Sequence, residues 1–175
     1  MPRGSRRGTS WEAAGGGDIT LSTVGVIGGV EMLNAAAISF LSPTTLVRIR
    51  GLILALPVGT STAQNEPSLL SLMIRKVSLD ETDTTYVPFA GDMFTPTFLS
   101  NEDILWTGAI VMLASSGSGA SGIGHRAAGF VDVDVKAKRK FESSEERLVF
   151  EAVVLNGDGS SVDVKMMLRC LMMAG

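Results

Sequence analysis

The sequence contains few of the side chains on which enzymes depend. Its 175 residues include one cysteine and one histidine. A lone cysteine, Cys170, excludes an intramolecular disulfide and a zinc site built from several cysteines, and its apolar neighbours indicate a buried structural thiol. A Ser/His/Asp or Cys/His catalytic set would need His125, which has no G-x-S-x-G motif near it and which we interpret as a solvent-facing residue at a strand end. We therefore predict that the protein is not an enzyme and needs no cofactor.

Aromatic and charged residues are also scarce. Aromatic residues make up 6% and charged residues 19% of the chain, against 45% hydrophobic residues. Trp11, Trp106 and Tyr86 are scattered, which argues against a module that reads bases by stacking. The formal net charge of −3 means that any contact with nucleic acid must come from local basic patches. So apolar a composition indicates that part of the surface is buried against other chains.

Long hydrophobic runs are missing as well. The most apolar stretch, residues 21–41, contains Glu31, Asn34 and three glycines. No run reaches the roughly 18 apolar residues that a membrane-spanning helix needs. We expect no membrane partner.

The last third of the sequence has the two-residue period of half-buried β-strands. We expect strands at residues 130–141, 148–155 and 162–172. Residues 156–159 (Asn-Gly-Asp-Gly) lie between the last two and predict a tight β-hairpin, because such turns need positive φ. In the first of these strands the two faces are Val131, Val133, Val135 and Ala137 on one side, and Asp132, Asp134, Lys136, Lys138 and Lys140 on the other.

Three earlier strands are expected at residues 46–56, 68–79 and 103–114. Residues 21–41 are ambiguous, because Val24, Val26 and the glycines favour a strand whereas residues 30–40 could form a helix of three turns. In the strand at 46–56, one face has Val47, Ile49, Ile53 and Ala55, and the other has Arg48 and Arg50.

The connections between these strands point to the architecture. Several exceed ten residues, which favours a Greek-key or jelly-roll sandwich over a simple meander. We predict an all-β fold, a single jelly-roll (Greek-key) β-sandwich over residues 19–175. Residues 1–18 are rich in Gly, Ser and Arg, and we predict a flexible basic N-terminal arm.

Two further features resemble ligand sites. Residues 117–122 spell the dinucleotide fingerprint GxGxxG, but no βαβ unit surrounds them, so a flexible surface loop is the better interpretation. Acidic residues at 80–83 and 101–103 could hold calcium through oxygen ligands. Because their spacing is irregular, solvated loops are favoured, and we predict no metal site.

The basic residues are better organised. Cations on every second residue of a strand are about 6–7 Å apart, close to the phosphate repeat of a single strand, which suits contact without sequence preference. The alternative is a solvated outer face balanced by acidic residues such as Asp132 and Asp134. The candidate nucleic-acid-binding residues are Arg3, Arg6 and Arg7 in the arm, Arg48 and Arg50 on one strand, and Lys136, Lys138 and Lys140 on another, with Arg139 facing the opposite way.

Five segments follow one another in a characteristic order: residues 44–51 (Thr-Thr-Leu-Val-Arg-Ile-Arg-Gly), residues 103–108 (Asp-Ile-Leu-Trp-Thr-Gly), His125, residues 131–140 (Val-Asp-Val-Asp-Val-Lys-Ala-Lys-Arg-Lys) and residues 146–150 (Glu-Arg-Leu-Val-Phe). This order resembles that of the single jelly-roll capsid proteins of small circular single-stranded DNA viruses and related metagenomic sequences. The resemblance implies a subunit that assembles into an icosahedral shell, with the arm and the basic strand residues on the genome side.

We therefore expect a coat protein found in the virion and, during assembly, inside the host cell. Its expected partners are copies of itself and single-stranded nucleic acid bound without sequence preference. An alternative from another class is a β-sandwich module that binds carbohydrate or another surface ligand through its Gly/Ser and acidic loops. A third, a β-sandwich enzyme, would require His125 or an acidic pair to be essential.

Overall fold

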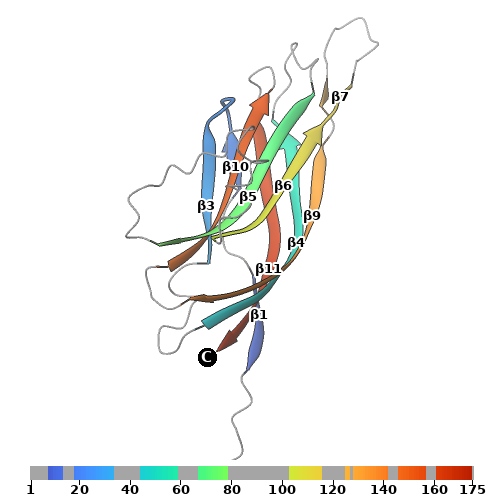
Figure 1. The fold of residues 1–175 in the computed structure, drawn as a ribbon. Coiled ribbons are helices and arrows are strands. Elements are labelled where there is room, and N and C mark those ends of the chain that lie inside the picture. Colours follow the sequence, from blue (N-terminus) through green and yellow to red (C-terminus); the bar gives the residue numbers. More distant parts are fainter. Residues whose placement is uncertain are drawn as a thin grey trace, which may run out of the picture.

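The computed structural model describes residues 8–13, 18–33, 44–58, 67–78, 103–115, 125–126, 128–141, 146–156 and 161–174. These residues form strands and turns and no helix. Two antiparallel sheets face one another as a β-sandwich (Figure 1). The strands are β1 (Thr9–Ala13), β2 (Ile19–Leu21), β3 (Ile27–Leu33), β4 (Thr44–Pro57), β5 (Ser68–Ser78), β6 (Ile104–Met112), β7 (Ala114–Ser115), β8 (His125–Arg126), β9 (Gly129–Phe141), β10 (Glu146–Asn156) and β11 (Val162–Ala174).

The order of the strands in each sheet differs from their order in the chain. The first sheet has the order β1-β11-β4-β9, and β2 also pairs with β11. The second sheet has the order β3-β10-β5-β6, and β7 and β8 form a separate short ribbon. Neighbouring strands in both sheets are antiparallel. Most sheet neighbours are therefore far apart in sequence.

The predicted all-β fold is confirmed. The six predicted strands correspond to β4, β5, β6, β9, β10 and β11, and their ends differ from the predicted ones by at most two residues. Within the ambiguous residues 21–41, Ile27–Leu33 forms β3, so the strand interpretation holds there. Residues 34–41 lie outside the described residues.

The β-hairpin predicted at residues 156–159 is wrong. β10 pairs with β3 and β5, whereas β11 pairs with β1, β2 and β4, so the chain crosses from the second sheet to the first between them. Gly, Asn and Asp favour a reversal of the chain but do not decide which strand the returning chain pairs with. A strand with one apolar face can bury that face in the core from either sheet of a sandwich.

Part of the predicted arm belongs to the first sheet. Thr9–Ala13 forms β1, which pairs with the C-terminal half of β11 from Thr9↔Met173 to Ala13↔Arg169. The boundary predicted at residue 18 thus falls between two strands, β1 and β2, that both pair with β11. The unpaired edge of β11 offers backbone hydrogen bonds to this segment, which its Gly- and Arg-rich composition does not reveal. Arg3, Arg6 and Arg7 lie outside the described residues.

The hydrophobic core lies between the two sheets. Residues that alternate along β4, β5, β10 and β11 fill it, and the largest side chains in it include Phe150 and Phe141. The alternation predicted for β9 is confirmed, since Val133 is buried and Asp132, Asp134 and Lys136 are exposed. The core members of β4 are Leu46, Ile49, Ile53 and Ala55.

Val47, which was predicted to share the core face of β4, does not join it. It is only half-buried, and the pairing of β4 with both β9 and β11 is irregular between Leu46 and Arg48. A β-bulge here shifts the alternation, so that Leu46 takes the core position expected for Val47. Opposite it on β9, Lys138 has a φ of 46°, a left-handed conformation that is uncommon outside glycine.

Candidate nucleic-acid interface

The two basic strand faces predicted from the sequence form one surface. β4 lies beside β9 in a register that places Arg48 opposite Lys136 and Arg50 opposite Asp134. Residues directly opposite in an antiparallel pair point to the same side of the sheet. Arg48, Arg50 and Lys136 therefore share the outer face of the first sheet, away from the core, with the exposed Lys138 and Lys140 further along β9.

β11 and β1 add two side chains, Arg169 and Trp11, that the sequence did not assign to the site. β11 lies on the other side of β4 and places Arg169 opposite Arg50 and Leu171 opposite Arg48. β1 in turn places Trp11 opposite Leu171. The pairing of β11 with β4 and β1 brings Arg169 and Trp11 to this surface. The basic face, as we call it, consists of Arg48, Arg50, Lys136, Lys138, Lys140 and Arg169.

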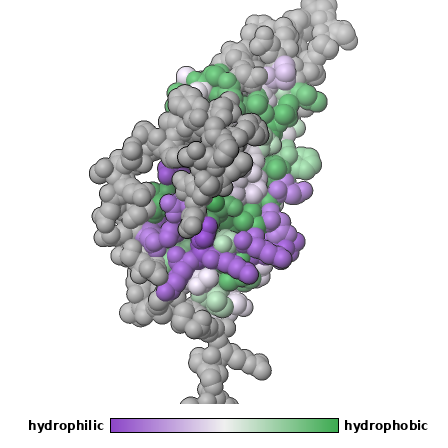
Figure 2. Space-filling view, viewed as in Figure 1, coloured by the Kyte–Doolittle hydropathy of each residue, from purple (hydrophilic) through white to green (hydrophobic). Residues whose placement is uncertain are grey.

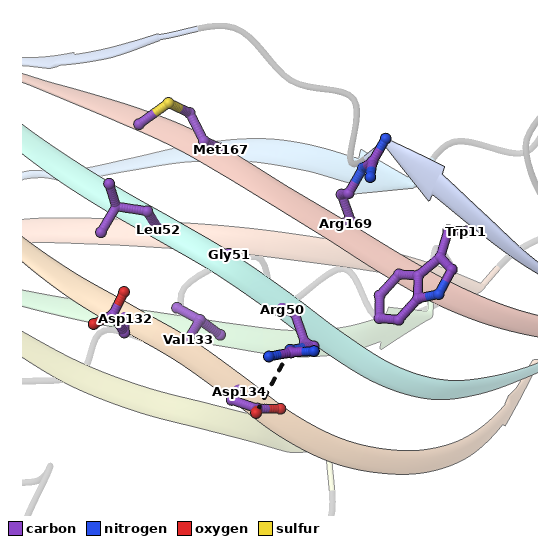
Figure 3. A pocket seen from close by; sticks show the side chains of 9 residues that line it. All are labelled: Trp11, Arg50, Gly51, Leu52, Asp132, Val133, Asp134, Met167 and Arg169. Carbon is purple, nitrogen blue, oxygen red and sulfur yellow. Dashed lines mark ion pairs between the residues drawn. The ribbon is translucent and has the colours of Figure 1, made fainter.

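A groove of about 770 Å³ crosses this face (Figure 3). Trp11, Arg50 and Arg169 lie toward one end of it in the view, and Leu52 and Met167 toward the other. Gly51 lies between the two ends and has no side chain to fill the groove. The remaining residues that line it are Asp132, Val133 and Asp134.

Arginine side chains neutralise one carboxylate in the groove. Arg48 donates from Nε to Oδ1 and from Nη2 to Oδ2 of Asp134, both at 2.6 Å. Nε of Arg50 is 3.6 Å from Oδ2 of the same residue. The hydrogen bonds from Arg48 hold the pKa of Asp134 below its usual range, and Asp134 in return raises the pKa of Arg48. Asp134 therefore stays ionised at neutral pH and occupies the guanidinium of Arg48.

The charge of this surface has the opposite sign to that of the whole chain. The six cations of the basic face outnumber Asp132 and Asp134 by four, whereas the chain as a whole has a formal net charge of −3. Arg169 makes no ion pair with a described residue, and the side chain of Arg50 is 56% exposed. An anionic polymer would find exposed donors here.

Large hydrophobic residues are exposed in two places only, within the described part of the chain. Trp11 and Met167 lie in the groove. The others lie at the end of the sandwich where β4 and β6 end and β3 and β9 begin, which forms the upper, hydrophobic part of the surface in Figure 2. This apolar end consists of Val24, Val26, Val58, Val111, Leu113 and Phe130.

Arg139 faces away from the basic face, as expected. It pairs with Leu46, which is fully buried, and so points toward the interior. Its Nε is buried and has no hydrogen-bond partner among the described residues. Arg139 therefore does not contribute to the outer surface.

The other candidates from the sequence contribute little to this site. Burial raises the pKa of the Cys170 thiol to about 12, so the thiol stays protonated and the prediction of a buried structural cysteine is confirmed. His125 lies in β8, where its backbone pairs with Ser115. Residues 80–83, 101–102 and 117–122 lie outside the described ranges. Within those ranges there is no group of three metal-ligating side chains, and no helix that could cross a membrane.

No protein-family model and no curated protein matches this chain. The resemblance to capsid proteins therefore stays a prediction, and the function is argued from the fold and from the basic face.

Proposed function

We propose that the protein is a jelly-roll coat protein that assembles into an icosahedral shell around nucleic acid. The observation that carries the proposal is the strand order. If the N-terminal strands β1 and β2 are counted together, eight strands follow in the order β1/β2, β3, β4, β5, β6, β9, β10 and β11, leaving out the short β7–β8 ribbon.

These eight strands are nested. The first pairs with the last (β1 and β2 with β11), the second with the seventh (β3 with β10), the third with the sixth (β4 with β9) and the fourth with the fifth (β5 with β6). A long antiparallel hairpin that wraps around a core produces this nesting and divides the strands between two sheets. The nesting supports the jelly-roll assignment, a fold that is frequent among viral capsid subunits and also occurs in lectins and cupins.

Because the same fold hosts several functions, the choice between them has to be argued from the surface of this protein. The apolar end exposes six large hydrophobic residues, with Leu113 at 64% and Phe130 at 67% exposure, as expected of a surface that packs against other chains. The basic face lies on the outer side of one sheet and fits a polyanion. Together they favour self-association and nucleic-acid contact over a monomeric ligand-binding module.

Assembly is tested with the purified full-length chain by negative-stain electron microscopy, light scattering, and the ratio of absorbance at 260 and 280 nm before and after nuclease treatment. We expect closed shells that protect nucleic acid. Leu113→Asp places a charge on the exposed apolar end and is expected to leave the subunit folded but to prevent assembly. A monomer at every salt concentration and pH would overturn the coat proposal and favour the carbohydrate-binding alternative.

Asp134→Asn is expected to strengthen binding to single-stranded nucleic acid several-fold. The substitution removes a negative charge from the groove and frees Arg48 and Arg50 for phosphates. One additional phosphate contact would steepen the slope of log affinity against log salt by about 0.7. In the wild-type protein the same gain is expected only at a pH below the ordinary titration range of aspartate, because Arg48 lowers the pKa of Asp134. Fluorescence anisotropy with a labelled oligonucleotide measures both.

The matched control is Asp163→Asn. Asp163 lies on β11 outside the groove, where it accepts a hydrogen bond of 2.7 Å from Thr20. The control removes the same charge and is expected to change affinity little. Equal effects of the two substitutions would mean that net charge, and not the Arg48–Asp134 contact, governs binding.

A further inference from the structure

We propose that Trp11, Arg50 and Arg169 form a nucleotide subsite, in which the indole stacks on a base of single-stranded nucleic acid and the two arginines bind flanking phosphates. The inference deepens the nucleic-acid part of the proposed function and rests on it, but it does not depend on shell formation. It starts from Trp11, which is 43% exposed although tryptophan is among the side chains with most to gain from burial.

The strand pairing holds Trp11 in place. The pairs from Thr9↔Met173 to Ala13↔Arg169 join the backbone around Trp11 to β11 on both sides of it. A large ring fixed on a sheet face in this way is a stacking platform that loses little conformational freedom when a base binds. In Figure 3 the indole lies beside the groove, near Arg50 and Arg169.

The two arginines are arranged for an anion. Arg169 and Arg50 are directly opposite on β11 and β4, where like charges destabilise the sheet unless an anion lies between or above them. The nearest carboxylate, Asp134, is 3.6 Å from Arg50 and has both oxygens occupied by Arg48 at 2.6 Å. Asp134 therefore does not cancel the repulsion between Arg50 and Arg169, and a bound phosphate would.

The chemistry of the groove favours a nucleotide over a neutral sugar. Its volume of about 770 Å³ is within the range of about 300–1,000 Å³ that is usual for small-ligand sites. A sugar site needs carboxylates beside the aromatic ring that are free to accept hydrogen bonds from hydroxyls. Asp134 already accepts two from Arg48, and Asp132 lies opposite Leu52, away from Trp11. The aromatic ring, the facing cations and the apolar Leu52 and Met167 instead match a base, its phosphates and a neighbouring base.

The test uses the full-length protein with Trp106→Phe, so that Trp11 is the only tryptophan. Titration with oligothymidylate of about ten nucleotides, a usual site size for single-strand binders, is expected to quench Trp11 fluorescence to saturation. Inorganic polyphosphate, which has charge but no bases, is expected to bind without this quenching. Equal quenching by polyphosphate, or saturable binding of neutral oligosaccharides alone, would overturn the subsite.

Substitutions separate stacking from charge. Trp11→Ala is expected to weaken oligothymidylate binding about 5- to 100-fold, and Trp11→Phe to restore most of the loss. Phe130→Ala removes an exposed aromatic ring of the same strand face outside the groove and is expected to have no effect. Unchanged binding by Trp11→Ala, or an equal loss with Phe130→Ala, would contradict stacking on Trp11.

The charge contribution has its own matched pair. Arg169→Ala is expected to lower the affinity for oligothymidylate and to reduce the slope of log affinity against log salt by about 0.7. Lys165→Ala removes a cation from the same strand, where it pairs with Asp18 at 2.9 Å outside the groove, and is expected to leave the slope unchanged. If shells form but the fluorescence of Trp11 is not quenched, the coat proposal stands and the nucleotide subsite is wrong. If the fluorescence is quenched and no shells form, the nucleotide subsite stands and the coat proposal is wrong.

Discussion

Glu151→Leu is expected to lower the free energy of unfolding by about 3–5 kcal/mol, because it leaves a buried cation without its partner. Arg75 donates to Glu151 from Nε to Oε2 at 2.8 Å and from Nη2 to Oε1 at 2.9 Å. Both side chains are about nine-tenths buried, with 10% of Arg75 and 8% of Glu151 exposed. They lie on the side of the second sheet that faces away from the core, where Met73 and Val153 are also buried. Equilibrium unfolding in urea measures the loss.

A double substitution separates the cost of an unpaired buried charge from the loss of the Arg75–Glu151 ion pair itself. Arg75→Met combined with Glu151→Leu removes both charges and fills the site with apolar atoms, and we expect it to recover most of the stability lost in Glu151→Leu alone. The exposed pair between Lys165 and Asp18 is the matched control, and Asp18→Ala is expected to have little effect, because water screens both groups. Equal losses for Asp18→Ala and Glu151→Leu would mean that burial does not set the strength of the Arg75–Glu151 pair.

Gly51→Ala is expected to destabilise the protein by about 2–4 kcal/mol. Gly51 has a φ of 150°, which other residues rarely adopt. A Cβ atom there would overlap the backbone carbonyl oxygen of Met167 and lie 2.9 Å from Cα of Leu168, so β11 would have to move away from β4. Thermal unfolding is expected to show a fall in Tm of about 5–15 °C for a chain of this size.

Gly29→Ala is the matched control. A Cβ atom at Gly29 would lie 3.5 Å from Cγ of Glu151 and 3.7 Å from the carbonyl oxygen of Phe150, which are ordinary contacts. Its expected effect is a gain of about 0.4–1 kcal/mol through reduced freedom of the unfolded chain. If Gly51→Ala were tolerated equally well, β4 and β11 would not be as close at Gly51 as the structure has them.

The Gly51 prediction also links stability to the groove. Arg50 precedes Gly51 on β4, and its partner Arg169 follows Leu168 on β11. A shift of β11 at Leu168 would therefore separate the two arginines as well as weaken the sheet. Partial loss of nucleic-acid affinity in folded Gly51→Ala protein would be evidence that the spacing of the two strands sets the binding geometry.

Much of the fold could be predicted from the sequence, because strand formation leaves a local signal. Side chains on successive residues point to opposite faces, so the alternation of Val133 with Asp132 and Asp134 gave both the strand and its exposed side before its neighbours were known. The same argument predicted that Arg48 and Arg50 face away from the core. It failed at Val47, because a bulge depends on the register with both neighbouring strands.

The candidate site could be predicted only in part. Arg48, Arg50 and the three lysines were identified as cations on exposed faces, but as two separate stripes. Trp11 was set aside because the aromatic residues are scattered along the sequence, and Arg169 was not among the candidates. Both line the groove because β11 lies between β1 and β4, a position that has no signature in the residues of β11.

The sequence by itself determined six of the strands and, except at Val47, which face of β4 and β9 is apolar, because these depend on residue type and on a period of two. Only the tertiary structure decided which strands are neighbours, that two basic stripes and a distant tryptophan lie on one face of the first sheet, and that Arg48 neutralises Asp134. The physical reason is that backbone hydrogen bonds between strands are chemically alike, so the partner of a strand is selected by the packing of the whole core and not by the strand's own sequence.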